Sequence, residues 1–132
     1  MPSIFTRIIN GEIPSHKIAE SDKYLAFLDI NPLVKGHTLV IPKVEIDYFF
    51  DLDQETLSEL MVFAQAVAKG MKAAIACDRI GVSVIGLEVP HAHVHLIPIN
   101  TTNDMNFANK KLSPTTENLS ETAAQISKFV RL

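Results

Sequence analysis

The sequence predicts an α+β fold built on an antiparallel sheet of about five strands. Strand-like segments follow one another through turns, and one long helical segment separates the third strand from the fourth, an order that differs from alternating βαβ units. The 132 residues, 47% hydrophobic and 20% charged, are typical of one compact domain. No repeat, low-complexity tract or linker divides the chain, so we expect a single domain over residues 1–132.

The first part of the chain predicts a helix and three strands. Ser3 to Asn10 has apolar residues on one side and is expected to form a short helix. Ile18 to Glu20 and Tyr24 to Leu28 predict a hairpin across a turn-prone Ser-Asp-Lys. The third strand, His37 to Ile41, is expected to stop at Pro42, because proline cannot donate a hydrogen bond to a sheet ladder.

The long helix is the clearest element of the second part. Apolar residues recur at three- and four-residue intervals from about Gln54 to Ala76, and either Asp51 or Asp53 is expected to cap this helix. The remaining elements are two strands and a last helix: Gly81 to Ile85, Ala92 to Ile99, and residues 114–131, opening at Ser113 and Pro114.

Charge and composition exclude several classes of function. The net charge is −3, with no basic stripe that would follow a nucleic-acid backbone, although one pocket can still bind a small phosphorylated ligand. No run approaches the ~20 apolar residues that span a bilayer. Cys77 is the only cysteine, so no disulfide can form within the chain. We therefore expect a cytoplasmic protein without nucleic-acid or membrane partners.

Three of the five histidines stand at 91, 93 and 95. Because side chains alternate along a strand, this spacing places the three imidazoles in one row, and the apolar residues between them point to the other face. Three interpretations are open: a solvated polar face, a metal site, or nucleophilic and acid–base chemistry on a phosphoryl group. We favour the last, with His93 attacking phosphorus and its two neighbours holding phosphoryl oxygens.

Residues 91–97 match the signature His-φ-His-φ-His-φ-φ, where φ is apolar, and the sequence resembles the histidine-triad superfamily. Further matches are Ile8-Ile9-Asn10-Gly11-Glu12-Ile13-Pro14, Ala26-Phe27-Leu28-Asp29-Ile30-Asn31-Pro32 and Gly36-His37-Thr38-Leu39-Val40-Ile41-Pro42-Lys43. The resemblance covers about residues 3–99 and is greatest to the Hint-like bacterial branch, whose members hydrolyse nucleoside phosphoramidates. It implies two main helices and a homodimer whose sheets join into one of ten strands.

The resemblance also implies roles for individual residues. His93 matches a nucleophile that forms a nucleotidyl-histidine intermediate, His91 and His95 its phosphate-contacting partners, and His37 a fourth active-site histidine. Asp29 matches a ribose-binding acid, although the same residue is common in turns. The positions that match the wall of the base pocket, and would serve equally well as core, are Phe5, Ile8, Phe27 and Ile30.

The sequence departs from the family pattern at two places. Many bacterial members bind a structural zinc through a Cys-x-x-Cys pair and a further histidine, where this chain has Ser3, Thr6 and Glu45; we therefore predict no metal. Where members usually carry Gln and Ser or Thr near the leaving group, this chain has Leu87 and Glu88. Glu88 is expected either to disfavour highly charged leaving groups or to point into solvent.

These observations predict a hydrolase or nucleotidyl transferase that needs no cofactor. It is expected to cleave at the α-phosphorus of nucleoside 5′-monophosphate derivatives, with a purine phosphoramidate as substrate. The alternatives are a nucleotide-binding regulatory or partner-binding module with little turnover, and a dinucleoside polyphosphate hydrolase. The polar segment of residues 101–112 matches no known pattern and is expected to cover the neighbouring subunit's pocket.

Overall fold

The computed structural model describes all 132 residues and contains a five-stranded antiparallel sheet with three α-helices, which confirms the predicted α+β class. The strands are β1 (Lys17–Glu20), β2 (Tyr24–Leu28), β3 (Thr38–Pro42), β4 (Arg79–Ser83) and β5 (Val94–Ile99). The helices are α1 (Ile4–Ile9), α2 (Gln54–Ala74) and α3 (Thr116–Ser127), with 3-10 turns η1 (Phe49–Asp51) and η2 (Thr102–Met105).

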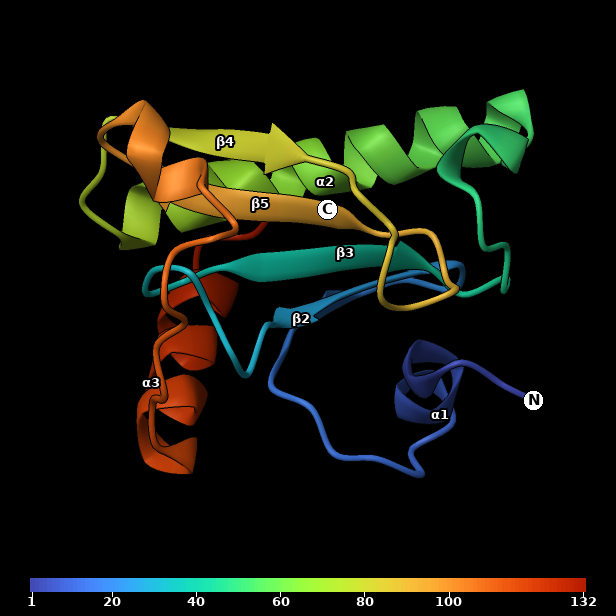
Figure 1. Cartoon of the computed structure of the whole chain (residues 1–132), viewed down its shortest axis with the longest axis horizontal. Helices are drawn as coiled ribbons and strands as arrows, with labels where there is room; N and C mark the ends of the chain where they lie inside the picture. Colours follow the sequence, from blue (N-terminus) through green and yellow to red (C-terminus); the bar gives the residue numbers. More distant parts are fainter.

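The strands lie in the order β1-β2-β3-β5-β4, so the last strand in sequence is inserted between β3 and β4 (Figure 1). Val40 of β3 is paired with Val94 of β5, and β4 is paired along its whole length with residues 95–99 of β5. The histidine segment therefore runs through the middle of the sheet, while β4 forms one edge.

Two apolar clusters cover the two faces of the sheet. The larger cluster packs α2 and α3 against one face, and includes Leu60, Val67 and Met71 of α2. In Figure 1, α2 runs alongside β4 and β5, whereas α3 and α1 lie toward opposite ends of the sheet. The smaller cluster lies on the other face, between α1 and strands β2 and β3: Phe5, Ile8, Leu25, Phe27, Leu39 and Ile41. Burying a side chain of this size contributes about 1.5–3 kcal/mol.

Side-chain caps fix where the helices begin. Ser3 Oγ accepts the Thr6 backbone N–H at 3.0 Å and caps α1. Asp53, rather than Asp51, caps α2. The predicted start of the last helix, with Ser113 as cap and Pro114 as first residue, is wrong by two residues. Thr115 Oγ1 accepts the Asn118 N–H at 3.1 Å as the cap, and α3 begins at Thr116. This helix also ends at Ser127 rather than near residue 131, and α2 ends two residues earlier than predicted.

Pairing between strands moves several of the predicted strand boundaries. Pro42 belongs to β3 and is paired with Tyr24, where its missing N–H leaves the rest of the ladder intact. β4 spans residues 79–83 instead of 81–85, and the chain then turns at Gly86, whose φ of +74° favours glycine. β5 begins at Val94 instead of Ala92. No helix in the structure combines the length and apolarity needed to cross a bilayer.

Candidate active site

The three histidines share one side of their segment, although only His95 lies within β5. The alternating residues Ala92, Val94 and Leu96 all belong to the apolar cluster under α2 and α3, as the spacing predicted. The exposed fractions of His91, His93 and His95 are 0%, 6% and 8%. The interpretation as a solvated polar face is therefore wrong, and the row is a buried, hydrogen-bonded group.

One hydrogen bond sets the tautomer of the neutral His93 ring. Its Nδ1 lies 2.7 Å from the His91 carbonyl oxygen, and because a carbonyl only accepts, Nδ1 must carry the hydrogen. In the neutral ring, Nε2 then holds an unshared electron pair. Phe5 packs edge-on against the same ring, with 5.1 Å between the ring centroids. In the neutral ring, Nε2 is thus a positioned hydrogen-bond acceptor beside an apolar neighbour.

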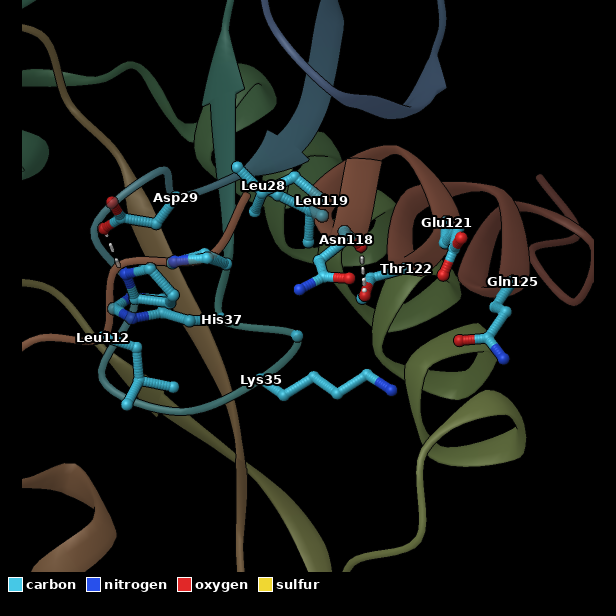
Figure 2. Close-up of a pocket in the computed structure, with 13 residues that line it drawn as sticks. Leu28, Asp29, Lys35, His37, Leu112, Asn118, Leu119, Glu121, Thr122 and Gln125 are labelled. Carbon is cyan, nitrogen blue, oxygen red and sulfur yellow. Dashed lines mark hydrogen bonds and ion pairs between the residues drawn. The ribbon is translucent and has the colours of Figure 1, made fainter. Parts of the chain in front are cut away.

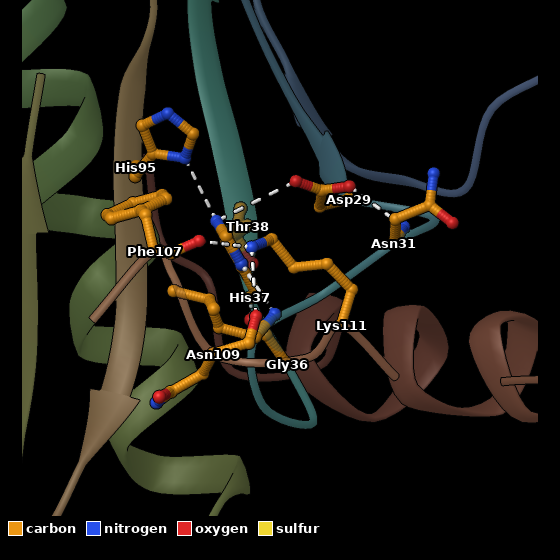
Figure 3. A network of polar contacts seen from close by, with 10 residues as sticks. Asp29, Asn31, Gly36, His37, Thr38, His95, Phe107, Asn109 and Lys111 are labelled. Atoms are coloured by element: carbon orange, nitrogen blue, oxygen red, sulfur yellow. Dashed lines mark hydrogen bonds and ion pairs between the residues drawn. The ribbon is translucent and has the colours of Figure 1, made fainter. Parts of the chain in front are cut away.

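His95 has the opposite tautomer because of its contact with His37. The Leu33 backbone N–H donates to His37 Nδ1 at 3.0 Å, so in the neutral ring the hydrogen of His37 is on Nε2. That Nε2 lies 2.9 Å from His95 Nδ1, which must therefore accept (Figure 3). The hydrogen of His95 is consequently on Nε2. His93 and His95, whose ring centroids are 4.9 Å apart, thus present an acceptor and a donor side by side.

Burial keeps the His37–His95 pair uncharged. Desolvation, reinforced by repulsion from His95, Lys111 and His93, lowers the pKa of His37 to about 3. Desolvation, reinforced by repulsion from His93, lowers the pKa of His95 to about 4. Both rings are therefore neutral near pH 7 and act there as hydrogen-bonding groups rather than as cations.

Asp29 lies directly after β2, next to His37. One carboxylate oxygen accepts the Asn31 N–H at 2.9 Å, which is the turn contact expected of an aspartate, and the other lies 3.8 Å from His37 Nε2. Burial is the main cause that raises the pKa of this carboxyl, against the opposing effect of the Asn31 hydrogen bond. The turn thus leaves one oxygen of Asp29 directed at the histidine group.

Asp29, His37 and His95 also form the chain's candidate metal group. One donor atom from each residue lies within 4.8 Å of the others, a set of nitrogen and oxygen ligands that suits zinc. All buried side-chain polar atoms of the structure already have hydrogen-bond partners, so no donor in this group requires an ion to satisfy it.

His91 is held from both ends of its ring. Nε2 lies 2.8 Å from the Pro42 carbonyl oxygen, and Nδ1 lies 2.8 Å from Ser3 Oγ. Thr6 and Glu45 join the same group, since Thr6 Oγ1 donates to Glu45 Oε1 at 2.6 Å. Ser3, Thr6 and Glu45, which stand where many bacterial members are expected to carry zinc ligands, therefore form one hydrogen-bonded group next to His91.

The apolar positions predicted for the base pocket divide into two groups. Phe5, Ile8 and Phe27 are buried in the cluster between α1 and the sheet, where Phe5 also contacts the ring of His91. Ile30 is 60% exposed and lies just beyond Asp29. The buried residues form a wall beside the histidines, and Ile30 is free to contact a ligand.

The loop between β4 and β5 carries the two positions that depart from the family pattern. Leu87 is 89% exposed, and the exposed Glu88 makes no side-chain hydrogen bond or ion pair. Glu88 is nevertheless near enough to Asp29 to contribute to the raised pKa of that carboxyl. It points into solvent and still acts electrostatically on the site.

Two residues of the segment 101–112 lie in the site and were not identified from the sequence. The Phe107 ring contacts His95 and His37 of its own chain, with centroid distances of 4.9 and 6.1 Å (Figure 3). Lys111 Nζ donates to the Phe107 carbonyl oxygen, and its charge opposes protonation of His37. No sequence pattern marks either residue, because only the path of the segment back across the sheet brings them there.

A pocket of about 360 Å³ adjoins this group, and Asp29 and His37 line it. Figure 2 shows these two residues on one side and Asn118, Glu121 and Gln125 of α3 on the other. His93 does not line this pocket. The pocket therefore lies beside the histidine row, and Asp29 and His37 separate the two.

Comparison with known proteins assigns the family. The model of the HIT domain matches residues 10–102. The chain belongs to the HIT family. An uncharacterized HIT-like protein of Borreliella burgdorferi is 36% identical and matches 94% of this HIT chain and 95% of its own length. The adenosine 5′-monophosphoramidase of Saccharomyces cerevisiae is 41% identical over 72% of this chain and 61% of its own length.

Solved structures agree with this assignment. A HIT-like protein from Bartonella henselae, described as involved in cell-cycle regulation, superposes with a TM-score of 0.83 at 35% identity. The match covers 96% of this chain and 94% of the Bartonella chain. The predicted resemblance to the histidine-triad superfamily is confirmed.

Proposed function

We propose that this HIT protein is a nucleotide hydrolase or nucleotidyl transferase that acts at the α-phosphorus of nucleoside 5′-monophosphate derivatives, with a purine phosphoramidate as substrate. The observation that carries the proposal is the hydrogen bond from His93 Nδ1 to the His91 carbonyl oxygen. It leaves the electron pair of Nε2 available for attack on phosphorus. The family relation to an adenosine 5′-monophosphoramidase supports this substrate class.

In the proposed first step, His93 Nε2 forms a bond to phosphorus. The phosphoramidate nitrogen takes a proton from solvent, the bond between phosphorus and this protonated nitrogen breaks, and its electron pair leaves with the neutral amine. His95 Nε2–H donates a hydrogen bond to a non-bridging oxygen, whose negative charge grows in the transition state. Asp29 accepts hydrogen bonds from the ribose hydroxyls, with the base against Ile30 and the wall of Phe5, Ile8 and Phe27.

In the second step, water attacks phosphorus and the bond to His93 Nε2 breaks. Nucleoside monophosphate is released, and the proton that water loses passes to solvent. His37 takes part only through His95, because its Nε2–H fixes the tautomer of that ring. Neither step requires a metal or another cofactor, since the charge on phosphorus is met by donors of the protein.

We also propose that the active form is a homodimer located in the cytoplasm. β4 is an edge strand with unpaired backbone groups, and Val82, Val84 and Ile85 on and after it are 54%, 38% and 44% exposed. A second copy paired along this edge would extend the sheet to ten strands. The unpaired Cys77 supports a reducing compartment.

The test is intact-protein mass spectrometry after rapid, acid-free quenching with adenosine 5′-phosphoramidate. Wild type is expected to carry an adenylyl adduct, and His93→Ala is expected to form none while still binding AMP. His16→Ala is the matched control, because His16 lies outside the row and its side chain makes only a 3.4 Å hydrogen bond with Ser120. An adduct in His93→Ala, or its loss in His16→Ala, would contradict the proposal.

The exposed Leu87 and Glu88 favour a second candidate, a nucleotide-binding module with little turnover, because neither side chain carries a neutral amide or hydroxyl that could bind a leaving group. Wild type that binds AMP but forms neither adduct nor product would support this second function.

A further inference from the structure

We propose that Glu45 is a positioning residue for His93, acting through Ser3, Thr6 and His91. The inference rests on the proposed function only in that His93 is taken as the nucleophile. Glu45 is exposed and lies in the loop after β3, and it contacts neither His93 nor His95. Its effect on the nucleophile is therefore indirect, through a continuous path of hydrogen bonds.

The path begins at the carboxylate. Glu45 Oε1 accepts the Ser3 backbone N–H at 2.7 Å and the Thr6 hydroxyl at 2.6 Å. These two bonds lower the pKa of the Glu45 carboxyl, so it is ionised near pH 7. Since bonds to an ionised acceptor are stronger than neutral ones, they tie the start of α1 to the loop after β3.

The middle of the path is the His91 ring. The Pro42 carbonyl oxygen at His91 Nε2 only accepts, so in the neutral ring the hydrogen is on Nε2 and Nδ1 accepts from the Ser3 hydroxyl, 2.8 Å away. The Thr6 oxygen lies farther from Ser3 Oγ, at 3.3 Å. The Nε2–H of the same ring donates to the Pro42 carbonyl oxygen at 2.8 Å. Both ring nitrogens are thus engaged by groups on two different segments, and the orientation of this fully buried ring is fixed.

The path ends at the backbone of His91. Its carbonyl oxygen accepts the His93 Nδ1–H at 2.7 Å, the bond that aligns the nucleophilic nitrogen. A shift of the His91 ring moves this carbonyl, and a misplacement on the order of 1 Å at a reacting group costs as much as about 100-fold in rate. The Ala92 N–H, in the same peptide unit as this carbonyl, donates to the Ile46 carbonyl oxygen of the loop that carries Glu45, and this bond remains when the carboxylate is removed. Removing the carboxylate should therefore loosen the path without unfolding the chain.

The test compares Glu45→Ala, Glu45→Gln and the control Glu12→Gln in single-turnover formation of the adenylyl adduct. Glu45→Ala is expected to lower the rate about 10-fold with the Kd for AMP unchanged within about 2-fold. Glu45→Gln is expected to restore most of the rate, since an amide oxygen accepts the same two hydrogen bonds. Glu12 makes no side-chain hydrogen bond or ion pair, so its variant should match wild type.

A second measurement reads the positioning without using activity. Imidazole nitrogen NMR of the free protein should show the Nε2–H tautomer of His91 and the Nδ1–H tautomer of His93 in wild type, and a mixture of tautomers in Glu45→Ala. A purely structural role would lower the melting temperature while leaving tautomers and adduct rate unchanged, and that result would overturn the proposal.

If wild type forms no adduct, the proposed function fails, and the NMR comparison alone decides the role of Glu45. If Glu45→Ala does not fold, Ser3→Ala, which removes the donor to His91 Nδ1, takes its place.

Discussion

The buried His37–His95 pair should make the stability of this chain fall between about pH 7 and about pH 5. In the folded chain the pKa values are about 3 and about 4, whereas an unfolded histidine titrates near 6.5. The unfolded chain therefore binds more protons in this range, and the free energy of unfolding must decrease as the pH is lowered. With about 1.4 kcal/mol per pKa unit, each ring accounts for about 2 kcal/mol over this interval, and the pair for about 4 kcal/mol.

Other titratable groups also contribute to the pH dependence of the free energy of unfolding, and each contribution has a known sign or lies in another pH range. The lowered pKa of His91 gives a further loss of the same sign. The raised pKa of Asp29 works in the opposite direction, because the folded chain holds that proton more readily than the unfolded chain. Glu45 and Asp53, whose pKa values are lowered below their ordinary 4.5 and 3.8, contribute mainly below this pH range.

The assay is urea unfolding followed by far-ultraviolet circular dichroism at several pH values across this range. Wild type is compared with His95→Gln and with the double variant His37→Gln/His95→Gln. The single variant should lose roughly half as much stability on acidification as wild type, and the double variant should retain only the opposing dependences from His91 and Asp29. A wild type whose stability is constant across the range, or a double variant as sensitive as wild type, would refute the electrostatic reasoning.

Three further predictions follow from single features of the structure. Glu88→Gln should raise kcat/KM for dinucleoside polyphosphates relative to adenosine 5′-phosphoramidate by about 10-fold, with Glu12→Gln as control, and an unchanged ratio would remove Glu88 from specificity. Gly70→Ala should lower the free energy of unfolding by about 1–3 kcal/mol in urea, because the added Cβ would lie 2.6 Å from Val130 Cγ2 and 3.0 Å from Val130 N. Dialysis against EDTA should leave the hydrolysis rate within about 2-fold of untreated protein, and a rate restored only by zinc would contradict the metal-free steps.

The elements that the sequence predicted well are those with a strong local pattern. The apolar periodicity of α2 and the alternation around His93 both depend on neighbours in sequence, and both are present in the structure. The boundaries depend on distant partners instead. β5 begins where Val94 meets Val40, and α3 begins where the Thr115 side chain can cap it, and neither choice is visible in a short window of sequence.

The same division applies to the candidate site. A spacing of two residues was enough to predict that the histidines lie in one row. Their tautomers depend on the Leu33 N–H and the His91 carbonyl, two backbone groups present in every non-proline residue and therefore marked by no residue type. Phe107 and Lys111 likewise reach the site only through the path of their segment.

The two departures from the histidine-triad pattern have different physical consequences. Where related proteins are expected to hold zinc, Ser3, Thr6 and Glu45 form hydrogen bonds that lead to His91, so the replaced residues still constrain the histidine row. At Leu87 and Glu88 no such replacement exists, because both side chains are exposed and neither makes a hydrogen bond. In the proposed reaction, the first departure preserves the geometry with which His93 would attack phosphorus, whereas the second changes the surface expected to meet the leaving group. Differences in activity from other HIT proteins should therefore be found in the choice of leaving group, while formation of the bond to His93 is retained.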